Sequence, residues 1–172
     1  MWRSDRKSCK TSFMTMNTIT SRGNGPALVM IHGWGQTKRA FEPLAESLKG
    51  DFRVVTFDLP GHGEARGDGG PYTFERFTNT LADLVRGLDN EPYHLLGWSM
   101  GGTVAARYCL EEAGALPKTL TLIASTPRFV APGKNLGIGQ HPAAVKKMVR
   151  MIRSDPHRVS KSSSPASSPP VR

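Results

Sequence analysis

The stretch from Tyr93 to Thr103 constrains the fold of this 172-residue chain more than any other part of its sequence. It reads Y-H-L-L-G-W-S-M-G-G-T, in which Gly97, Ser99 and Gly101 form the pattern G-x-S-x-G. A short apolar run precedes the pattern, as expected of a buried strand, and a helix-compatible run over 100–112 follows it. Strand, tight turn and helix together place the central serine in a strained, exposed bend. We therefore predict a nucleophile elbow at Ser99, with a plain glycine-rich turn as the alternative.

Apolar runs of strand length alternate with runs of helical spacing along the chain. Ala27 to Ile31 is apolar throughout and lies between Pro26 and His32, so we expect a strand buried on both faces. Alternation of strands and helices predicts an α/β domain with a mostly parallel sheet and flanking helices. The predicted strands span 17–20, 27–31, 52–59, 93–98 and 120–124; the predicted helices span 37–48, 74–88 and 100–112; and residues 64–71 are expected to form a loop.

Four segments are predicted in the domain organisation. Residues 1–13 form a polar leader, 14–130 an α/β core, 131–159 a lid-like helical segment and 160–172 a Ser/Pro-rich tail. Leader and tail have the low-complexity, polar composition of disordered segments. Within the third segment, residues 142–153 have the spacing of a short basic amphipathic helix.

The net charge of +9 is concentrated at the two ends of the chain. Residues 1–13 carry a net +3 and residues 133–172 a net +7, which leaves −1 for residues 14–132. A nucleic-acid-binding domain is expected to carry a basic face on its folded body, so this distribution argues against a nucleic-acid partner. The leader lacks the apolar region of a secretory signal, and no apolar stretch is long enough to span a membrane.

The cysteines and motifs of the sequence indicate a cellular location and the absence of a bound cofactor. The two cysteines, Cys9 and Cys109, lie in a polar leader and a predicted helix, so a disulfide framework is not expected and a cytoplasmic location fits. The sequence has no P-loop and no cluster of metal-ligating residues, so we expect neither a metal nor an organic cofactor. A monomer is expected.

A nucleophilic Ser99 needs hydrogen-bond donors for the oxyanion that forms on its substrate. Met100 supplies one backbone N–H at the positive end of the following helix. Trp34, within His32-Gly33-Trp34-Gly35, is placed to offer the second, because Gly33 lets the loop after the first buried strand turn toward the serine. Gly97 and Gly101 are expected to be required because a side chain at either position would collide across the bend.

The general base and its orienting acid are not recognisable in the sequence. In this kind of site the chain order is serine, then acid, then histidine. After Ser99 the only candidates are His141, His157, Glu111, Glu112 and Asp155, none of which follows a further strand. The earlier polar residues have structural interpretations: His32 in its loop, His62 capping a turn, His94 in or near a strand, and Asp58 bracing the loop 60–63.

Four linked segments resemble the α/β-hydrolase family: L-V-M-I-H-G-W-G-Q, F-D-L-P-G-H-G, L-L-G-W-S-M-G-G and L-I-A-S-T-P-R-F, all within about residues 16–130. Within this family the chain is most similar to carboxylesterases of biotin synthesis, which act on a pimeloyl methyl ester carried by acyl carrier protein. The resemblance implies a serine esterase with Ser99 as nucleophile, Trp34 and Met100 as oxyanion donors, and Trp34 also touching an acyl-carrier-protein-linked or small ester. It implies a helical lid after Phe129 whose basic side chains meet the acidic carrier.

The chain also departs from this family. Members are longer, and two further strands after the lid carry the acid and histidine of the triad. We therefore expect a C-terminally truncated hydrolase fold, with low or no activity as this chain alone and with residues 120–124 as an exposed sheet edge. Two alternatives stay open: another ester, acyl or haloalkane hydrolase chemistry on the same fold, and a non-catalytic remnant that binds an acidic partner.

Overall fold

The computed structural model describes residues 19–111, 116–131 and 139–155. The chain divides into two compact units between Ser125 and Thr126. The predicted polar leader and Ser/Pro-rich tail lie outside the described residues, and the predicted boundary near residue 130 between core and lid stays a prediction. The first unit holds the sheet and the G-x-S-x-G segment.

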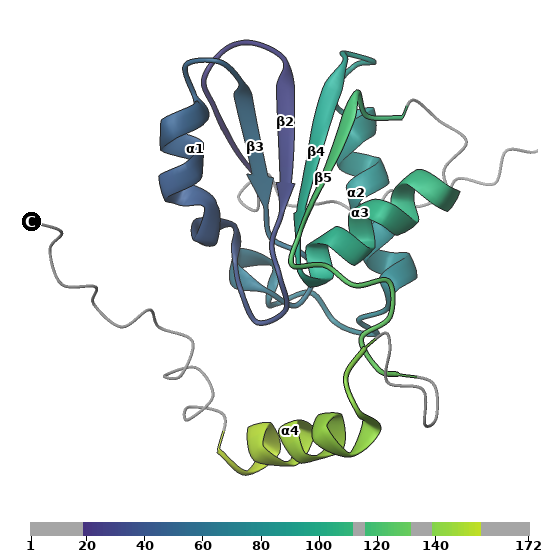
Figure 1. The fold of residues 1–172 in the computed structure, drawn as a ribbon. Coiled ribbons are helices and arrows are strands. Elements are labelled where there is room, and N and C mark those ends of the chain that lie inside the picture. Colours follow the sequence, from purple (N-terminus) through teal and green to yellow (C-terminus); the bar gives the residue numbers. More distant parts are fainter. Residues whose placement is uncertain (1–18, 112–115, 132–138, 156–172) are drawn as a thin grey trace, which may run out of the picture. The chain divides into compact units, whose positions relative to one another are not determined.

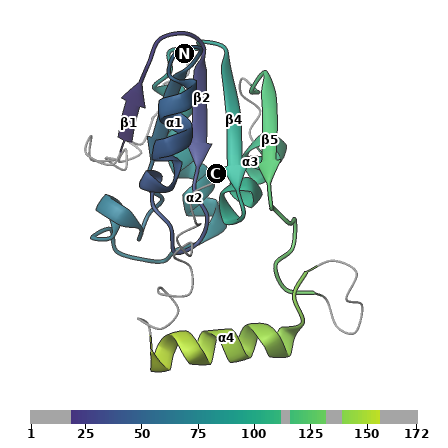
Figure 2. The same cartoon turned by 60° about the vertical axis from the view of Figure 1, so that its left-hand side comes forward.

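The first unit is built on one five-stranded sheet with the order β1-β3-β2-β4-β5; Figure 1 labels β2 to β5, and Figure 2 labels β1. Strands β2, β3, β4 and β5 run parallel, and β1 pairs antiparallel with β3. The mostly parallel α/β sheet predicted from the sequence is therefore confirmed. The strands span Ile19–Arg22 (β1), Ala27–Ile31 (β2), Arg53–Phe57 (β3), Tyr93–Trp98 (β4) and Thr119–Ile123 (β5).

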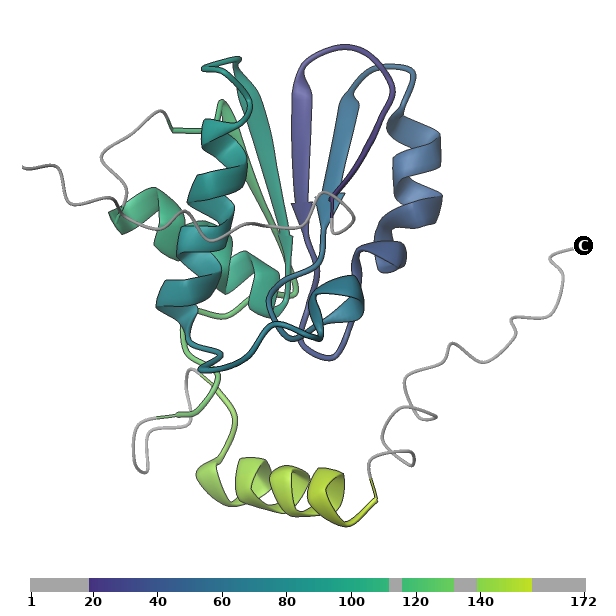
Figure 3. The same ribbon diagram turned by 180° about the vertical axis from the view of Figure 1, so that it is seen from behind.

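Helices cover both faces of this sheet. Helix α1 lies on one face, and α2 and α3 lie together on the other (Figures 1 and 3). The bounds are Lys38–Phe41 for the 3-10 helix η2, Glu42–Leu48 for α1, Gly63–Ala65 for the 3-10 helix η3, Phe74–Arg86 for α2 and Met100–Glu111 for α3.

Several predicted elements differ in their bounds from the structure, and two differ in type. The single helix predicted over 37–48 is wrong: Lys38–Phe41 is a 3-10 helix, and the α-helix begins only at Glu42. Pro43 accounts for this start, because its missing N–H is tolerated in the first turn of a helix. The loop predicted over 64–71 was also incomplete, since Gly63–Ala65 forms a 3-10 turn at its beginning.

The core lies in two clusters, one on each face of the sheet. All five residues of β2 are buried, which confirms the prediction for this strand. Ala27, Val29 and Ile31 pack with the side chains of α2 and α3. Leu28 and Met30 pack on the α1 side. The alternation follows from the two-residue repeat of a strand, and it fixes the position of the loop that follows β2.

Strand β5 lies at an edge of the sheet, opposite β1 (Figure 2). Every residue of Thr119–Ile123 is exposed, with Leu120, Leu122 and Ile123 at 38, 48 and 41%. The prediction of an exposed edge is confirmed. The strand begins and ends one residue earlier than predicted, and Ala124 adopts a left-handed conformation with φ of 47°.

The second unit contains helix α4, Pro142–Ser154, as the amphipathic pattern predicted. His141 precedes the helix, and its Nδ1 accepts a hydrogen bond from the Ala143 N–H at 3.1 Å. No residue of α4 is buried. In the three described ranges, no helix is long and apolar enough to cross a lipid bilayer.

Candidate active site

Ser99 occupies the junction between β4 and α3 in a strained backbone conformation. Its φ is 54°, in the left-handed region that residues other than glycine rarely adopt. Its N–H donates to the Ile123 carbonyl of β5 at 2.9 Å, and its carbonyl accepts from the Gly102 N–H at 3.0 Å. The predicted strand, turn and helix context of the serine is thus confirmed. Such strain persists only where the surroundings hold the residue in place.

The glycines of the motif allow the elbow to pack tightly. A Cβ on Gly97 would overlap the backbone of Gly102 in the first turn of α3. A Cβ on Gly101 would overlap the Ile31 carbonyl at the end of β2. The collision predicted across the bend is confirmed for Gly97. For Gly101 the collision is instead with the neighbouring strand β2, which shows why α3 can begin directly against that strand.

The loop after β2 meets the elbow at Gly33. Strands β2 and β4 are parallel neighbours with Ile31 opposite Gly97, so their carboxyl ends lie side by side. A Cβ built on Gly33 would lie 3.3 Å from the Ser99 Cβ, which leaves this glycine in close approach to the serine. Trp34 follows with 54% of its surface exposed. The structure therefore brings the loop and the elbow together, as their proposed joint role requires.

His32 holds this loop in place. Its ring is fully buried, and Nε2 accepts the Leu59 N–H at 3.0 Å. Nδ1 lies 2.8 Å from the Gly33 carbonyl and must carry the proton, because Nε2 is the acceptor. Burial lowers the pKa of His32 below its usual value, which favours this neutral form. Both nitrogens are engaged, so His32 is structural, as predicted.

Asp58 fixes the second loop at this edge of the sheet. Its carboxylate accepts the Glu64 N–H at 3.0 Å and the Lys38 N–H at 2.7 Å, while the side chain is almost fully buried. The bond to Glu64 confirms the predicted bracing role. The bond to Lys38 was not foreseen, because it joins segments 20 residues apart in the sequence.

Among the described residues, no hydrogen bond joins a histidine to Ser99. His62 Nδ1 lies 3.1 Å from the Pro60 carbonyl, and His94 Nδ1 lies 2.8 Å from the Thr119 hydroxyl. His141 caps α4 in the other unit, and His157 lies outside the described residues. The Glu111 carboxylate accepts from the Arg107 guanidinium at 2.6 Å. The described geometry thus contains the elbow and its neighbouring loop without a hydrogen-bonded base.

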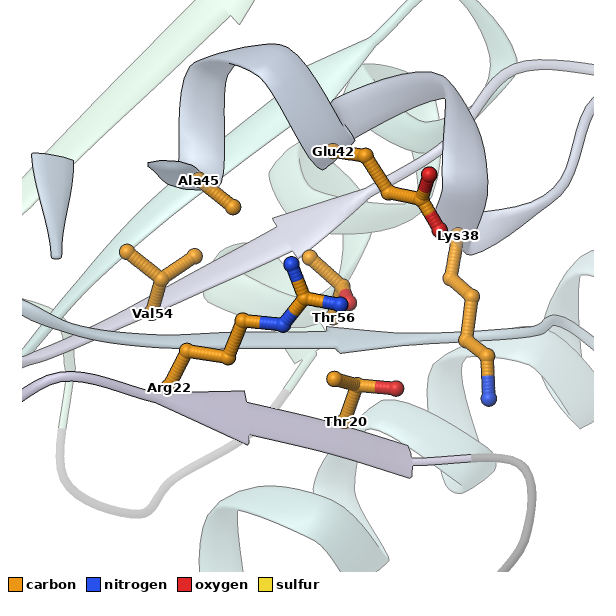
Figure 4. Close-up of a pocket in the computed structure, with 7 residues that line it drawn as sticks. All are labelled: Thr20, Arg22, Lys38, Glu42, Ala45, Val54 and Thr56. Atoms are coloured by element: carbon orange, nitrogen blue, oxygen red, sulfur yellow. The ribbon is translucent and has the colours of Figure 1, made fainter. Parts of the chain in front are cut away.

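A pocket on the α1 face lies away from the elbow (Figure 4). Its walls come from β1, β3, η2 and α1, and the Arg22 side chain extends over it toward Thr56 and Glu42. Strands β3 and β2 separate β1 from β4 in the sheet, so this pocket is not part of the Ser99 site. No group of three or more His, Cys, Asp or Glu side chains in the described ranges is arranged to hold a metal ion.

Sequence reasoning missed the contribution of β5 to the elbow. The Ile123 carbonyl receives the Ser99 N–H, and the next residue, Ala124, is itself strained. No local sequence motif predicts either feature, since both depend on the pairing of β5 with β4. The polar Ser125-Thr126-Pro127 sequence, one residue after the strand, is a local signal that the chain leaves the sheet here.

Curated relatives named pimeloyl-[acyl-carrier protein] methyl ester esterase include the following two. The protein from Nitrosomonas europaea is 42% identical over 112 residues, which cover 65% of this chain and 42% of that protein. The protein from Stenotrophomonas maltophilia strain R551-3 is 38% identical over 139 residues, which cover 80% of this chain and 50% of that protein. The chain thus spans half or less of the length of these two relatives.

Solved structures with the same fold include an esterase from Exiguobacterium antarcticum, with a TM-score of 0.76 and 24% identity over 84% of this chain and 54% of that one. A bromoperoxidase from Bacillus anthracis gives a TM-score of 0.75 at 24% identity, over 80% of this chain and 51% of that one. At this identity the likeness shows the fold alone. Residues 28–169 match the alpha/beta hydrolase family. With this match, the elbow at Ser99 and the parallel sheet, the chain belongs to the alpha/beta hydrolase family.

Proposed function

We propose that this chain carries the nucleophile half of a serine carboxylesterase site. The observation that carries the proposal is Ser99, held at φ of 54° between β4 and α3 with Gly33 against it. Ser99 is the nucleophile, and the backbone N–H groups of Trp34 and Met100 are the oxyanion donors. This arrangement accounts for the strain at the serine, for the glycine in close approach and for the clamped His32 loop.

The reaction that fits these groups is acyl transfer from an ester to serine. The Ser99 hydroxyl adds to the ester carbonyl, whose oxygen becomes the oxyanion held by the two N–H groups. The carbon–oxygen bond to the alcohol then breaks, and the alcohol leaves with the serine's proton. Water releases the acid and restores Ser99. The described residues contain no acid–histidine pair bonded to Ser99. Oxyanion stabilisation and binding alone are expected to give about 10³–10⁴-fold acceleration over water, so slow turnover is expected.

The proposed substrate is a methyl ester on a pimeloyl chain attached to acyl carrier protein. Support comes from the relatives of that name, and from the exposed Trp34 beside the elbow, which is available to an acyl chain. The basic residues of α4, Lys146, Lys147, Arg150 and Arg153, are a candidate contact for the acidic carrier. A cytoplasmic location remains a prediction from the sequence.

An activated ester tests the proposed nucleophile. With p-nitrophenyl acetate, the protein is expected to release about one equivalent of p-nitrophenol and to gain one acetyl group on Ser99, because the good leaving group makes acylation faster than hydrolysis of the unactivated acetyl-serine ester. The Ser99→Ala variant should release none above background. Ser47→Ala, which changes an exposed serine on α1, is the matched control. Equal release by wild type and Ser99→Ala would reject the proposal.

A non-catalytic protein that binds an acidic partner is the second candidate. It is favoured by α4, which carries four basic residues and buries none of its side chains in the described structure. Competition separates the two candidates. If the site binds substrate, the pimeloyl methyl ester on its carrier should protect Ser99 from acetylation better than the unloaded carrier does. Equal binding of both carriers, with no acylation of Ser99 by any ester, would favour the binding protein.

A further inference from the structure

Ser125 lies against the elbow and makes contacts that the proposed reaction does not use. Its hydroxyl lies 3.0 Å from the Ile123 carbonyl oxygen and 3.4 Å from the Gly97 carbonyl oxygen. Both neighbours are acceptors, so the hydroxyl is the donor in each contact. The Ile123 carbonyl is also the acceptor of the Ser99 N–H at 2.9 Å. Ser125 therefore contacts the Ile123 carbonyl, which accepts the Ser99 N–H. It also contacts the carbonyl of Gly97, two residues before Ser99.

The Ser125 side chain also packs on the first turn of α3. A Cβ built on Gly102 would overlap the Ser125 hydroxyl and lie 2.6 Å from its Cβ. Gly97 in turn lies against Gly102. Strand β4, helix α3 and the end of β5 thus meet at one small polar side chain. A larger residue at position 102 would displace it.

Backbone strain brings Ser125 into this position. Four residues other than glycine have positive φ in the described structure. Asp89 and Asn90 are of the types that tolerate this conformation in turns. Ser99 at 54° and Ala124 at 47° are not. Ala124 turns the chain at the end of β5, so that the next side chain reaches back to β4 and α3. Strain of this kind clusters at functional sites.

We propose that Ser125 is a positioning residue that orients the Trp98–Ser99 peptide, and with it the backbone from which the Ser99 hydroxyl projects. Strand β5 has no outer neighbour in the described sheet, so the Ile123 carbonyl is held on that side by β4 and by Ser125. Loss of the hydroxyl frees this carbonyl to shift, and the Ser99 N–H that it accepts shifts with it. The catalytic consequence rests on the proposed function, whereas the structural consequence rests on the hydrogen bonds alone.

Two measurements on the full chain test this role in Ser125→Ala, Ser125→Thr and wild type. The first is hydrogen exchange at the Ser99 amide, and the second is the rate at which a fluorophosphonate labels Ser99. Ser125→Ala is expected to speed the exchange about tenfold and slow the labelling about tenfold, as a small misplacement of a reacting group does. Ser125→Thr keeps the hydroxyl and should restore both. Ser47→Ala, which loses a comparable serine-to-carbonyl bond of 2.8 Å on α1, should change neither.

The remaining outcomes of these two measurements also decide the role of Ser125. Unchanged exchange and labelling in Ser125→Ala would overturn the proposal. Faster exchange at Ser99 that is accompanied by faster exchange at the central amides of Val29 and Leu95 would also overturn it, because such a result indicates general destabilisation of the protein. If Ser125→Ala does not fold, Ser125→Cys, with a similar shape and a weaker donor, is judged by the same criteria. If folded wild type is never labelled, the proposed function fails, while the exchange at Ser99 still decides the role of Ser125.

Discussion

At the scale of the single residue, the conformation of Ser99 lowers the stability of the folded protein, whereas the contacts of His32 raise it. Ser99 is held in a conformation that costs an L-residue about 1–2 kcal/mol, so the protein folds in spite of it. His32 is buried with both nitrogens engaged, so the protein folds partly because of it. Each difference predicts a measurable change in the free energy of unfolding.

Replacing Ser99 with glycine is expected to leave stability unchanged or raise it by up to about 1 kcal/mol. Relief of the left-handed strain exceeds the cost of glycine's extra freedom in the unfolded chain, which is about 0.5–1 kcal/mol. Denaturant titration measures the difference. Ser47→Gly, in the regular helix α1, is the control and should lower stability by about 0.5–1 kcal/mol. A loss at Ser99 as large as the loss at Ser47 would show that position 99 is not strained.

Stability should fall as the pH falls below about 6.5, in part because of His32. Burial lowers its pKa in the folded protein, so the unfolded chain takes up a proton that the folded one refuses. The contribution is fully present above the unfolded pKa, and it decreases by up to about 1.4 kcal/mol per pH unit until the folded pKa is reached. Unfolding curves at about pH 7.5 and about pH 5.5 measure it. The free energy of unfolding of His32→Gln should depend less on pH than that of the wild type. An identical pH dependence would show that other titratable groups cause the effect.

The elements of this fold were predictable to the extent that local pattern decides them. The apolar run of β2 and the glycines around Ser99 predicted a buried strand and an elbow, and both are present. Helix α1 was predicted too long because its apolar spacing continues through η2, where only the hydrogen-bond pattern differs. The contacts of Ile123 and Ser125, and the bond between Asp58 and Lys38, were not predictable, since each depends on which strands are neighbours.

Strand β5 is expected to cause concentration-dependent association. It has no outer neighbour in the described sheet, and it exposes apolar side chains without a charged residue in the strand, which favours edge-to-edge pairing. Leu122→Lys should reduce this association in sedimentation experiments. Leu110→Lys changes a leucine on α3 that is 87% exposed but lies outside the sheet, and it should have little effect. Equal reductions in association by both variants would indicate that association depends on exposed apolar side chains in general, not on the edge of the sheet.

At the scale of the whole molecule, the sheet unit and the helix of the second unit differ in character. The sheet unit has the buried core and the assembled elbow, and its part of the sequence is close to neutral. Helix α4 is basic and buries none of its residues in the described structure. The chain spans 42 and 50% of the lengths of the two curated relatives compared above, and the segment with the G-x-S-x-G elbow lies in its sheet unit.

The pH dependence of fluorophosphonate labelling tests the central proposal, that Ser99 is an assembled nucleophile with no hydrogen-bonded base among the described residues. We expect slow, stoichiometric labelling at Ser99 alone, detected by mass spectrometry, with a rate that rises steadily with pH because no histidine of pKa near about 6.5 assists the hydroxyl. Absence of labelling in folded protein, or labelling spread over other serines, would contradict the assembled elbow. Rapid labelling with an inflection near about pH 6.5 would contradict the missing base.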